Sequence, residues 1–206
     1  MKNLRLAIVA GLLLSTSARA EPGWTPVSEK KGVTVEKRAV PGSPWSEYRA
    51  TARHALPPER VFAAVRSERL DDPRARRYVK HHDVLRANDH ERLVYEQVAS
   101  PMVSDRDYTV LIQWSADPAR RVFEMKFHLE NDAGPPPAKG FVRIPDIHGS
   151  WRIEATPDGG SRIEYIVYSD PGGSIPAWIA RGAQADSTRD NVLDSLAYAE
   201  SHPSAR

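Results

Sequence analysis

Residues 122–130 read VFEMKFHLE and alternate strictly between apolar and polar side chains. The apolar members are Phe123, Met125, Phe127 and Leu129. Because successive side chains of a β-strand point to opposite faces, this stretch predicts a strand with one apolar and one polar face. That pattern is typical of an antiparallel sheet that is packed on one side and exposed to water on the other.

Similar segments lie on both sides of this strand, separated by turn-forming residues. With residues 122–130 included, nine strands are predicted, at 33–38, 48–55, 84–87, 92–99, 106–114, 122–130, 140–144, 150–155 and 162–168. In the segment 106–114, one side carries Tyr108, Val110, Ile112 and Trp114. The other side carries Asp107, Thr109 and Gln113, which we expect to face water.

Helices are predicted at both ends of this run of strands. Pro57 and Pro58 stand where a helix begins, with Val61, Phe62 and Val65 behind them at helical spacing. A second, short polar helix is predicted over residues 67–80, and a long helix from Pro176 to about Ala199. No repeat or linker divides the chain, so the pattern indicates one α+β domain over residues 21–200 and a flexible tail at 201–206.

Composition excludes several classes of protein. The chain has 206 residues, 40% of them hydrophobic and 27% charged, which is near the norm for globular proteins and unlike a disordered or collagen-like chain. The absence of cysteine rules out disulfides, thiol catalysis and zinc–thiolate sites. The basic cluster at 74–77 lies beside acidic residues and is read as a solvated helix face.

The first twenty residues have the layout of a secretory signal peptide. A basic start is followed by the apolar run LAIVAGLLL at 6–14 and by Ala18-Arg19-Ala20, which has the form of a cleavage site. We expect cleavage after Ala20 and a periplasmic or secreted protein. Loss of Lys2, Arg5 and Arg19 would change the net charge from +2 to −1, so no partnership with nucleic acid is expected.

Four motifs, in order, resemble those of the START (StAR-related lipid transfer) family within the helix-grip superfamily. They are SPMVSDRDY at 100–108, Gly149-Ser150-Trp151, Asp158-Gly159-Gly160 and YSDPGGSIPAWI at 168–179. The resemblance implies a helix-grip fold: a curved antiparallel sheet around an apolar tunnel that is closed by the long C-terminal helix. It also implies that a monomer binds one lipid or sterol-like molecule without a cofactor or metal and contacts a membrane transiently.

The resemblance also suggests which side chains face the tunnel. The family directs the arginine of its Arg-Asp-aromatic motif, and every second residue after it, inward. The implied ligand-binding residues are Leu93, Tyr95, Gln97, Arg106, Tyr108, Val110, Ile112, Met125, Phe127, Tyr165, Trp178 and Ile179. Sterol carriers of the family often hold a buried acid and an arginine at two facing positions, which align here with Leu93 and Ile112. This departure favours a different headgroup contact, or a more apolar ligand.

Other interpretations remain open at this point. In one of them the tyrosines simply pack in a core, and Arg106 forms an ion pair with Asp105 or Asp107 at the strand end. The superfamily contains cyclases and hydratases, so the alternative function is an enzyme acting on an aromatic or polyketide-like substrate, with Tyr95, Arg106 or Tyr165 as the polar catalyst. A third possibility is a protein-binding module, which would need an exposed apolar patch.

Metal binding has little support in the sequence. The one metal-like cluster, His81, His82, Asp83 and His90, lies on a strand and the turn after it. Adjacent histidines on a strand point to opposite faces, so they do not converge on one ion.

Overall fold

A computed structural model describes residues 23–70, 76, 78–100, 103–175 and 177–203. Side chains are described in all of these except 68–70 and 177–181. The predicted signal peptide lies outside the described residues, as do residues 204–206 of the predicted tail. Neither helix in the described part of the chain is long and apolar enough to cross a membrane.

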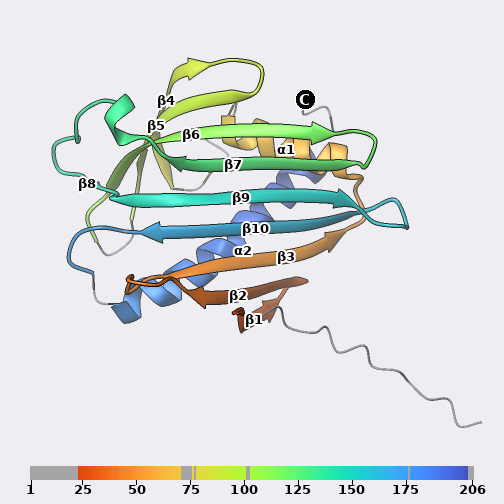
Figure 1. Cartoon of the computed structure of the whole chain (residues 1–206), viewed down its shortest axis with the longest axis horizontal. Helices are drawn as coiled ribbons and strands as arrows, with labels where there is room; N and C mark the ends of the chain where they lie inside the picture. Colours follow the sequence, from red (N-terminus) through yellow and green to blue (C-terminus); the bar gives the residue numbers. More distant parts are fainter. Residues whose placement is uncertain (1–22, 71–75, 77, 101–102, 176, 204–206) are drawn as a thin grey trace, which may run out of the picture.

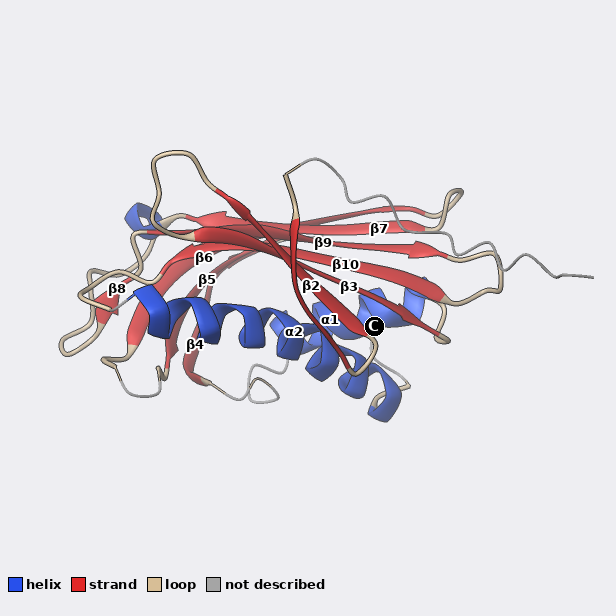
Figure 2. Cartoon of the chain, turned by 90° about the horizontal axis from the view of Figure 1, so that it is seen from below, coloured by secondary structure: helices blue, strands red, loops and turns tan. Residues whose placement is uncertain are grey.

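The strands form one curved sheet, and both helices lie on the same face of it (Figures 1 and 2). The strands are β1 (Thr25–Lys30), β2 (Val33–Ala39), β3 (Ser46–His54), β4 (Val79–Ala87), β5 (Glu91–Val98), β6 (Arg106–Asp117), β7 (Val122–Leu129), β8 (Val142–Arg143), β9 (Asp146–Ala155) and β10 (Ser161–Asp170). The helices are α1 (Pro58–Leu70) and α2 (Ala177–Ser201), and a short 3₁₀ turn, η2, covers Asn131–Ala133.

The order of strands across the sheet is β1-β2-β3-β10-β9-β7-β6-β5-β4. All of these neighbours are antiparallel, and the short β8 adds a parallel pairing to the start of β6. The pairing of β3 with β10 joins the first part of the chain to the last. The prediction of an α+β fold with a curved antiparallel sheet and a long C-terminal helix is confirmed.

Three local predictions need correction. Residues 67–80 do not form a separate helix, because α1 continues through Leu70 and β4 begins at Val79; residues 71–75 and 77 lie outside the described part. β1 was not predicted, since it is an edge strand with mostly exposed side chains and no apolar alternation. The strand expected at 140–144 is reduced to the two residues of β8.

The expected wet face of β6 is also only partly correct. Gln113 is exposed, but Asp107 and Thr109 are fully buried. The segment after β7 folds over them: Thr109 N–H donates to Asn131 Oδ1 at 2.9 Å, and Ala138 N–H donates to Asp107 Oδ2 at 2.8 Å. The side chain of Arg143 adds two further hydrogen bonds to Asp107. A connecting segment, rather than a helix, thus covers this part of the convex face.

The core lies between the concave face of the sheet and the helices. Helix α2 packs against β2, β3 and β10 and against α1 (Figure 2). Its inner positions include Val192 and Leu196, which join one cluster with buried side chains of every long strand from β2 to β10 except β4. The middle of α2 is polar. Thr188 is buried there, and its hydroxyl donates a hydrogen bond to the carbonyl oxygen of Gln184.

Gly149, on the concave face of β9, makes room for the ring of Phe127. A Cβ atom at this position would lie 2.2 Å from the carbonyl oxygen of Ile166 and 2.5 Å from the Phe127 ring. We predict that Gly149→Ala lowers the free energy of unfolding by about 1–3 kcal/mol, because neither the strand backbone nor the packed ring can move freely. Urea-induced unfolding measures this change.

Gly182→Ala serves as the matched control, since a Cβ atom there meets nothing within 4 Å. In a helix this change is expected to leave stability unchanged or to raise it by up to about 1 kcal/mol. Equal stabilities of the two variants would show that the tight approach at Gly149 is not real.

Candidate ligand-binding site

A cavity of about 160 Å³ lies between the concave face of the sheet and α2. Strands β5, β6, β7, β9 and β10 provide most of its wall, and α2 contributes Asn191. The lining residues are Arg76, Glu96, Tyr108, Val110, Ile112, Met125, Phe127, Ile147, Trp151, Tyr165 and Asn191. Most of the wall is therefore apolar or aromatic, with charged groups confined to one part.

Aromatic side chains fill much of the space on the concave face. Tyr165 stacks on Trp151 with ring centroids 4.3 Å apart and on Phe127 at 6.4 Å. These residues belong to paired positions on β7, β9 and β10, so their side chains project from the same face of the sheet. This packing explains why the cavity is small for a sheet of this size.

The polar part of the cavity is a buried ion pair between Arg76 and Glu96. The Arg76 guanidinium donates to both carboxylate oxygens, with a distance of 2.9 Å from Nη2 to Oε2. The Tyr108 hydroxyl donates to Oε2 at 2.7 Å, and His82 Nδ1 lies 2.9 Å from Oε1. The Glu96 side chain is 3% exposed and that of Arg76 is 16% exposed. The carboxylate thus has four polar contacts in place of water.

Comparison with known proteins places this architecture in a family. The model of the START domain matches residues 9–191. The chain belongs to the START domain family. A solved StAR-related lipid transfer protein from Xanthomonas axonopodis is 27% identical, with a TM-score of 0.69 over 87% of this chain and 98% of that one.

Two more distant solved structures share the fold. Human StAR-related lipid transfer protein 5 is 18% identical, with a TM-score of 0.77 over 89% of each chain. The Zhui aromatase/cyclase from Streptomyces sp. R1128 is 16% identical, with a TM-score of 0.55 over 77% of this chain and 96% of that one. The helix-grip architecture is therefore shared by START proteins and by at least one protein named as an enzyme.

Half of the ligand-binding residues implied by the START resemblance line the cavity. They are Tyr108, Val110, Ile112, Met125, Phe127 and Tyr165. Trp178 and Ile179 belong to α2, but their side chains lie outside the described residues. Whether any of these residues contacts a ligand remains a prediction.

The placement of Leu93, Tyr95 and Gln97 toward the cavity is wrong. In β5 they pair with Leu111, Thr109 and Asp107, and directly paired residues of antiparallel strands share a face. They therefore lie on the convex side, where Tyr95 donates its hydroxyl to Asp107 and accepts from Gln97. The concave positions of β5 are one residue out of phase: Val94 pairs with Val110, and Glu96 pairs with Tyr108.

No pattern in the sequence decides this register. Residues 92–98 read RLVYEQV and carry apolar side chains on both faces, because both faces of β5 are buried near its centre. The reading of the 74–77 cluster as a solvated helix face is wrong for Arg76, which is largely buried. The acid Glu96 within the otherwise apolar centre of this strand was the signal in the sequence that pointed to a buried ion pair.

Arg106 lies on the concave side of β6 but does not line the cavity. Its guanidinium donates to the carbonyl oxygens of Ser104, Pro171 and Gly172. It thus connects the loop before β6 with the turn between β10 and α2. Two of the motifs that carry the START resemblance, at 100–108 and 168–179, therefore hold each other in place through one side chain.

The charge states of the ion-pair cluster follow from its surroundings. Burial alone would raise the pKa of the Glu96 carboxyl, but the charge of Arg76 and the hydrogen bonds from His82, Arg76 and Tyr108 lower it well below its usual range. Burial and then the Glu96 charge raise the pKa of the Tyr108 phenol well above its usual range. At neutral pH, Glu96 is anionic and Tyr108 is protonated.

The candidate metal cluster of the sequence does not form a site. No group of three or more His, Asp or Glu side chains in the described part of the chain could hold an ion. His81 instead contacts Asp83, and His82 contacts Glu96. This agrees with the expected divergence of adjacent histidines on a strand.

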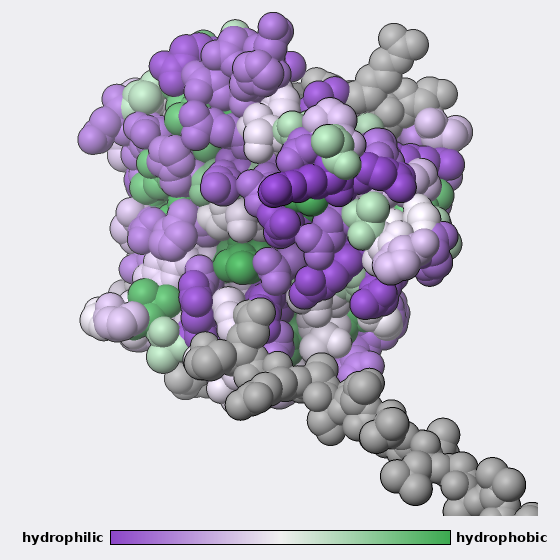
Figure 3. All heavy atoms as spheres, turned by 45° about the vertical axis from the view of Figure 1, so that its right-hand side comes forward, coloured by the Kyte–Doolittle hydropathy of each residue, from purple (hydrophilic) through white to green (hydrophobic). Residues whose placement is uncertain are grey.

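In the described part of the chain, large exposed hydrophobic residues, which a protein-binding module would need, are few. Among the described residues they are Val27, Tyr78, Val84 and Leu85. On the face shown in Figure 3, hydrophobic side chains are scattered among polar ones rather than gathered into a patch.

Replacing Glu96 tests how much the ion pair contributes to the stability of the fold. Glu96→Gln keeps the shape but leaves the buried Arg76 without a counter-charge, so we predict a loss of about 3 kcal/mol in the free energy of unfolding at pH 7. Glu124→Gln is the control, because Glu124 and its partner Arg152 are 34% and 43% exposed. That change should cost less than about 1 kcal/mol.

The stability gap between wild type and Glu96→Gln should also depend on pH. The pKa of Glu96 is lower in the folded protein than its ordinary value of 4.5, so its contribution is present above pH 4.5 and is lost as the pH falls below it. Unfolding curves between pH 6 and pH 3 measure the gap. A gap of constant size over this range would contradict an ionised, paired Glu96.

Proposed function

We propose that this START protein is a non-enzymatic carrier that binds one hydrophobic molecule bearing a single neutral polar group in the cavity beneath α2. The observation that carries the proposal is a buried polar cluster, centred on the Arg76–Glu96 ion pair, at one part of an otherwise apolar and aromatic cavity. An apolar ligand exchanges hydrocarbon for a similar lining, at about 25 cal/mol per Å² of surface kept from water.

The polar cluster favours a neutral ligand group over a charged one. The charges of Arg76 and Glu96 cancel within their ion pair, so a charged headgroup would enter without a counter-ion and lose its hydration. A hydroxyl or carbonyl needs only one or two hydrogen bonds. Arg76 has five N–H donors, and the Tyr108 oxygen keeps acceptor capacity after it donates to Glu96. The cavity thus has an acid, Glu96, and an arginine, Arg76, in its lining. They come from other positions than the two at which sterol carriers of the family hold such a pair, which here are Leu93 and Ile112.

The size of the cavity supports a moving lid. Pockets for small molecules usually measure about 300–1,000 Å³, and this cavity measures about 160 Å³. A lipid or sterol-like ligand therefore requires α2 to shift. The turn before α2 contains Gly172 and Gly173, both with positive φ, which is a conformation that glycine adopts without strain. We propose that this turn is the hinge.

The charge states of the cavity support binding rather than catalysis. A general acid or base works best with a pKa near the working pH. The pKa of Glu96 is lowered and that of Tyr108 is raised, so neither group exchanges a proton near pH 7. The alternative, a cyclase or hydratase acting on an aromatic or polyketide-like substrate, has the likeness of fold as its support.

The sequence features outside the cavity complete the proposal. The basic start, the apolar run at 6–14 and the site at 18–20 favour export to the periplasm or the medium. We propose that the exported protein acts as a monomer and contacts a membrane surface transiently to collect or release its ligand.

Native mass spectrometry of the protein purified from its exporting host tests the proposal. We expect a one-to-one adduct of lipid or sterol-like mass, which organic extraction then releases for identification. An unliganded mass, with no uptake from mixed lipids and sterols, would contradict the carrier function.

A pair of neighbouring substitutions tests the location of the ligand. Val110 lines the cavity, whereas Leu111 lies on the convex face. We predict that Val110→Phe fills the cavity and weakens uptake of the extracted ligand by at least about tenfold, a change of about 1.4 kcal/mol. Leu111→Phe places the same ring on the other face and should bind as the wild type does. Equal binding by both folded variants would place the ligand elsewhere.

A further inference from the structure

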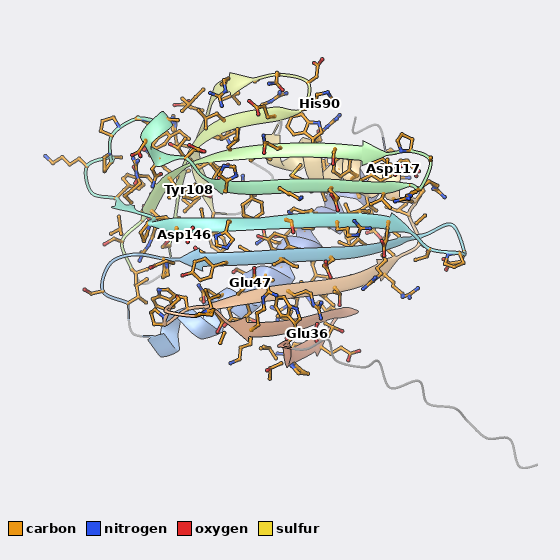
Figure 4. All side chains as sticks on the ribbon, in the orientation of Figure 1. Glu36, Glu47, His90, Tyr108, Asp117 and Asp146 are labelled. Atoms are coloured by element: carbon orange, nitrogen blue, oxygen red, sulfur yellow. The ribbon has the colours of Figure 1, made fainter. Side chains whose placement is uncertain are left out.

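A second hollow lies at the other end of the sheet, outside the cavity. It is a groove of about 610 Å³ between α1, the turn from β4 to β5, and the adjoining ends of β6 and β7. In Figure 4, His90 of the turn and Asp117, the last residue of β6, lie at the same end of the sheet as this groove. Tyr108 of the cavity lies toward the other end of β6. The volume falls within the range of small-molecule sites.

The floor of the groove is apolar and rigid. Phe62 of α1 stacks on Phe123 of β7 with ring centroids 5.3 Å apart, and Trp114 of β6 lies beside them. Ala63 of α1 also lines the groove, and its small side chain leaves space there. Both phenylalanines are buried in the core, so the floor is held by the fold and does not depend on a ligand.

Two guanidinium groups adjoin this floor. The Arg66 guanidinium lies 5.9 Å from the centre of the Trp114 ring, and that of Arg92 lies 5.7 Å from it. Arg92 also donates to the carbonyl oxygen of Asn88. Within the described part of the chain, the Arg66 guanidinium contacts the Trp114 ring and forms no ion pair with a carboxylate. Arg66 is half-buried, so its charge acts in a partly desolvated setting.

The other charged groups of the groove do not neutralise Arg66. Glu59, about two helical turns away on α1, accepts two hydrogen bonds from Arg121 at 2.7 and 2.8 Å. These bonds lower the pKa of the Glu59 carboxyl and keep its charge matched by Arg121. Asp89 and His90 stand at the exposed rim, where water screens the Asp89 charge.

We propose that this groove is a second binding site, for an amphiphilic carboxylate: an apolar chain or ring that ends in one negative charge. The apolar part lies on Phe62, Phe123 and Trp114, and the carboxylate pairs with Arg66. A guanidinium binds a carboxylate through two parallel hydrogen bonds, which a neutral alcohol cannot match. The groove thus differs from the cavity, whose polar cluster is already neutral. The two sites are independent, and the second does not rest on the first.

Calorimetric titration with dodecanoate, below its micelle concentration and with dodecanol as the uncharged probe, tests the groove. We expect dodecanoate to bind, and Arg66→Met to weaken it by about tenfold or more, because methionine keeps an apolar side chain and removes the charge-assisted hydrogen bonds. Arg120→Met removes the same charge from an 84% exposed side chain near the same end of the molecule, and it should bind dodecanoate as the wild type does.

The variant Val110→Phe separates this site from the cavity. Dodecanoate binding should persist in Val110→Phe, since Val110 lines the cavity and not the groove. Three results would overturn the proposal: no dodecanoate binding at millimolar concentration, equal affinity in Arg66→Met, or loss of binding in Val110→Phe but not in Arg66→Met. Failure of the carrier function would appear separately, as an unliganded native mass alongside intact dodecanoate binding.

Discussion

A carboxylate buried on the concave face of a sheet must be compensated, and the structure around the cavity is arranged to compensate Glu96. Removing one ion from water costs on the order of several kcal/mol, and the Glu96 side chain is 3% exposed. Arg76, His82 and Tyr108 supply its contacts from three different segments of the chain. The ion pair therefore fixes how β4, β5, β6 and Arg76, three residues before β4, meet. The same contacts define the polar part of the cavity.

A second connection lies two residues from Tyr108 along β6, outside the cavity. Arg106 joins the loop before β6 to the turn before α2 through carbonyl oxygens of both. Because the guanidinium carries several donors in a fixed plane, one side chain can fix two loops. This gives a physical reason for two motifs that lie far apart in the START sequence pattern, and it makes Arg106 a positioning residue for α2 rather than a contact of the cavity.

The sequence was enough to predict the segments in which one face is apolar and the other is polar. The alternation in 122–130 and the proline before each helix gave β7, α1 and α2, and the START motifs gave the fold. It did not suffice for β5, where both faces are buried and a slip of one residue exchanges Glu96 for Tyr95. It also missed the burial of Asp107, because the segment from 131 to 143 that covers it contacts it through the backbone N–H of Ala138 and the side chain of Arg143. Tertiary contacts of this kind produce no periodic pattern of apolar and polar residues in a sequence.

The central claim is that a ligand occupies the cavity beneath α2, and a single methyl group reports on it. The chain has three methionines, Met1, Met102 and Met125, and Met125 is 2% exposed in the cavity wall. Methyl NMR of protein labelled at the methionine methyl groups, recorded before and after addition of mixed lipids and sterols, measures occupancy directly. The account predicts that the buried Met125 signal shifts on ligand uptake. Uptake that leaves this signal unchanged would contradict it.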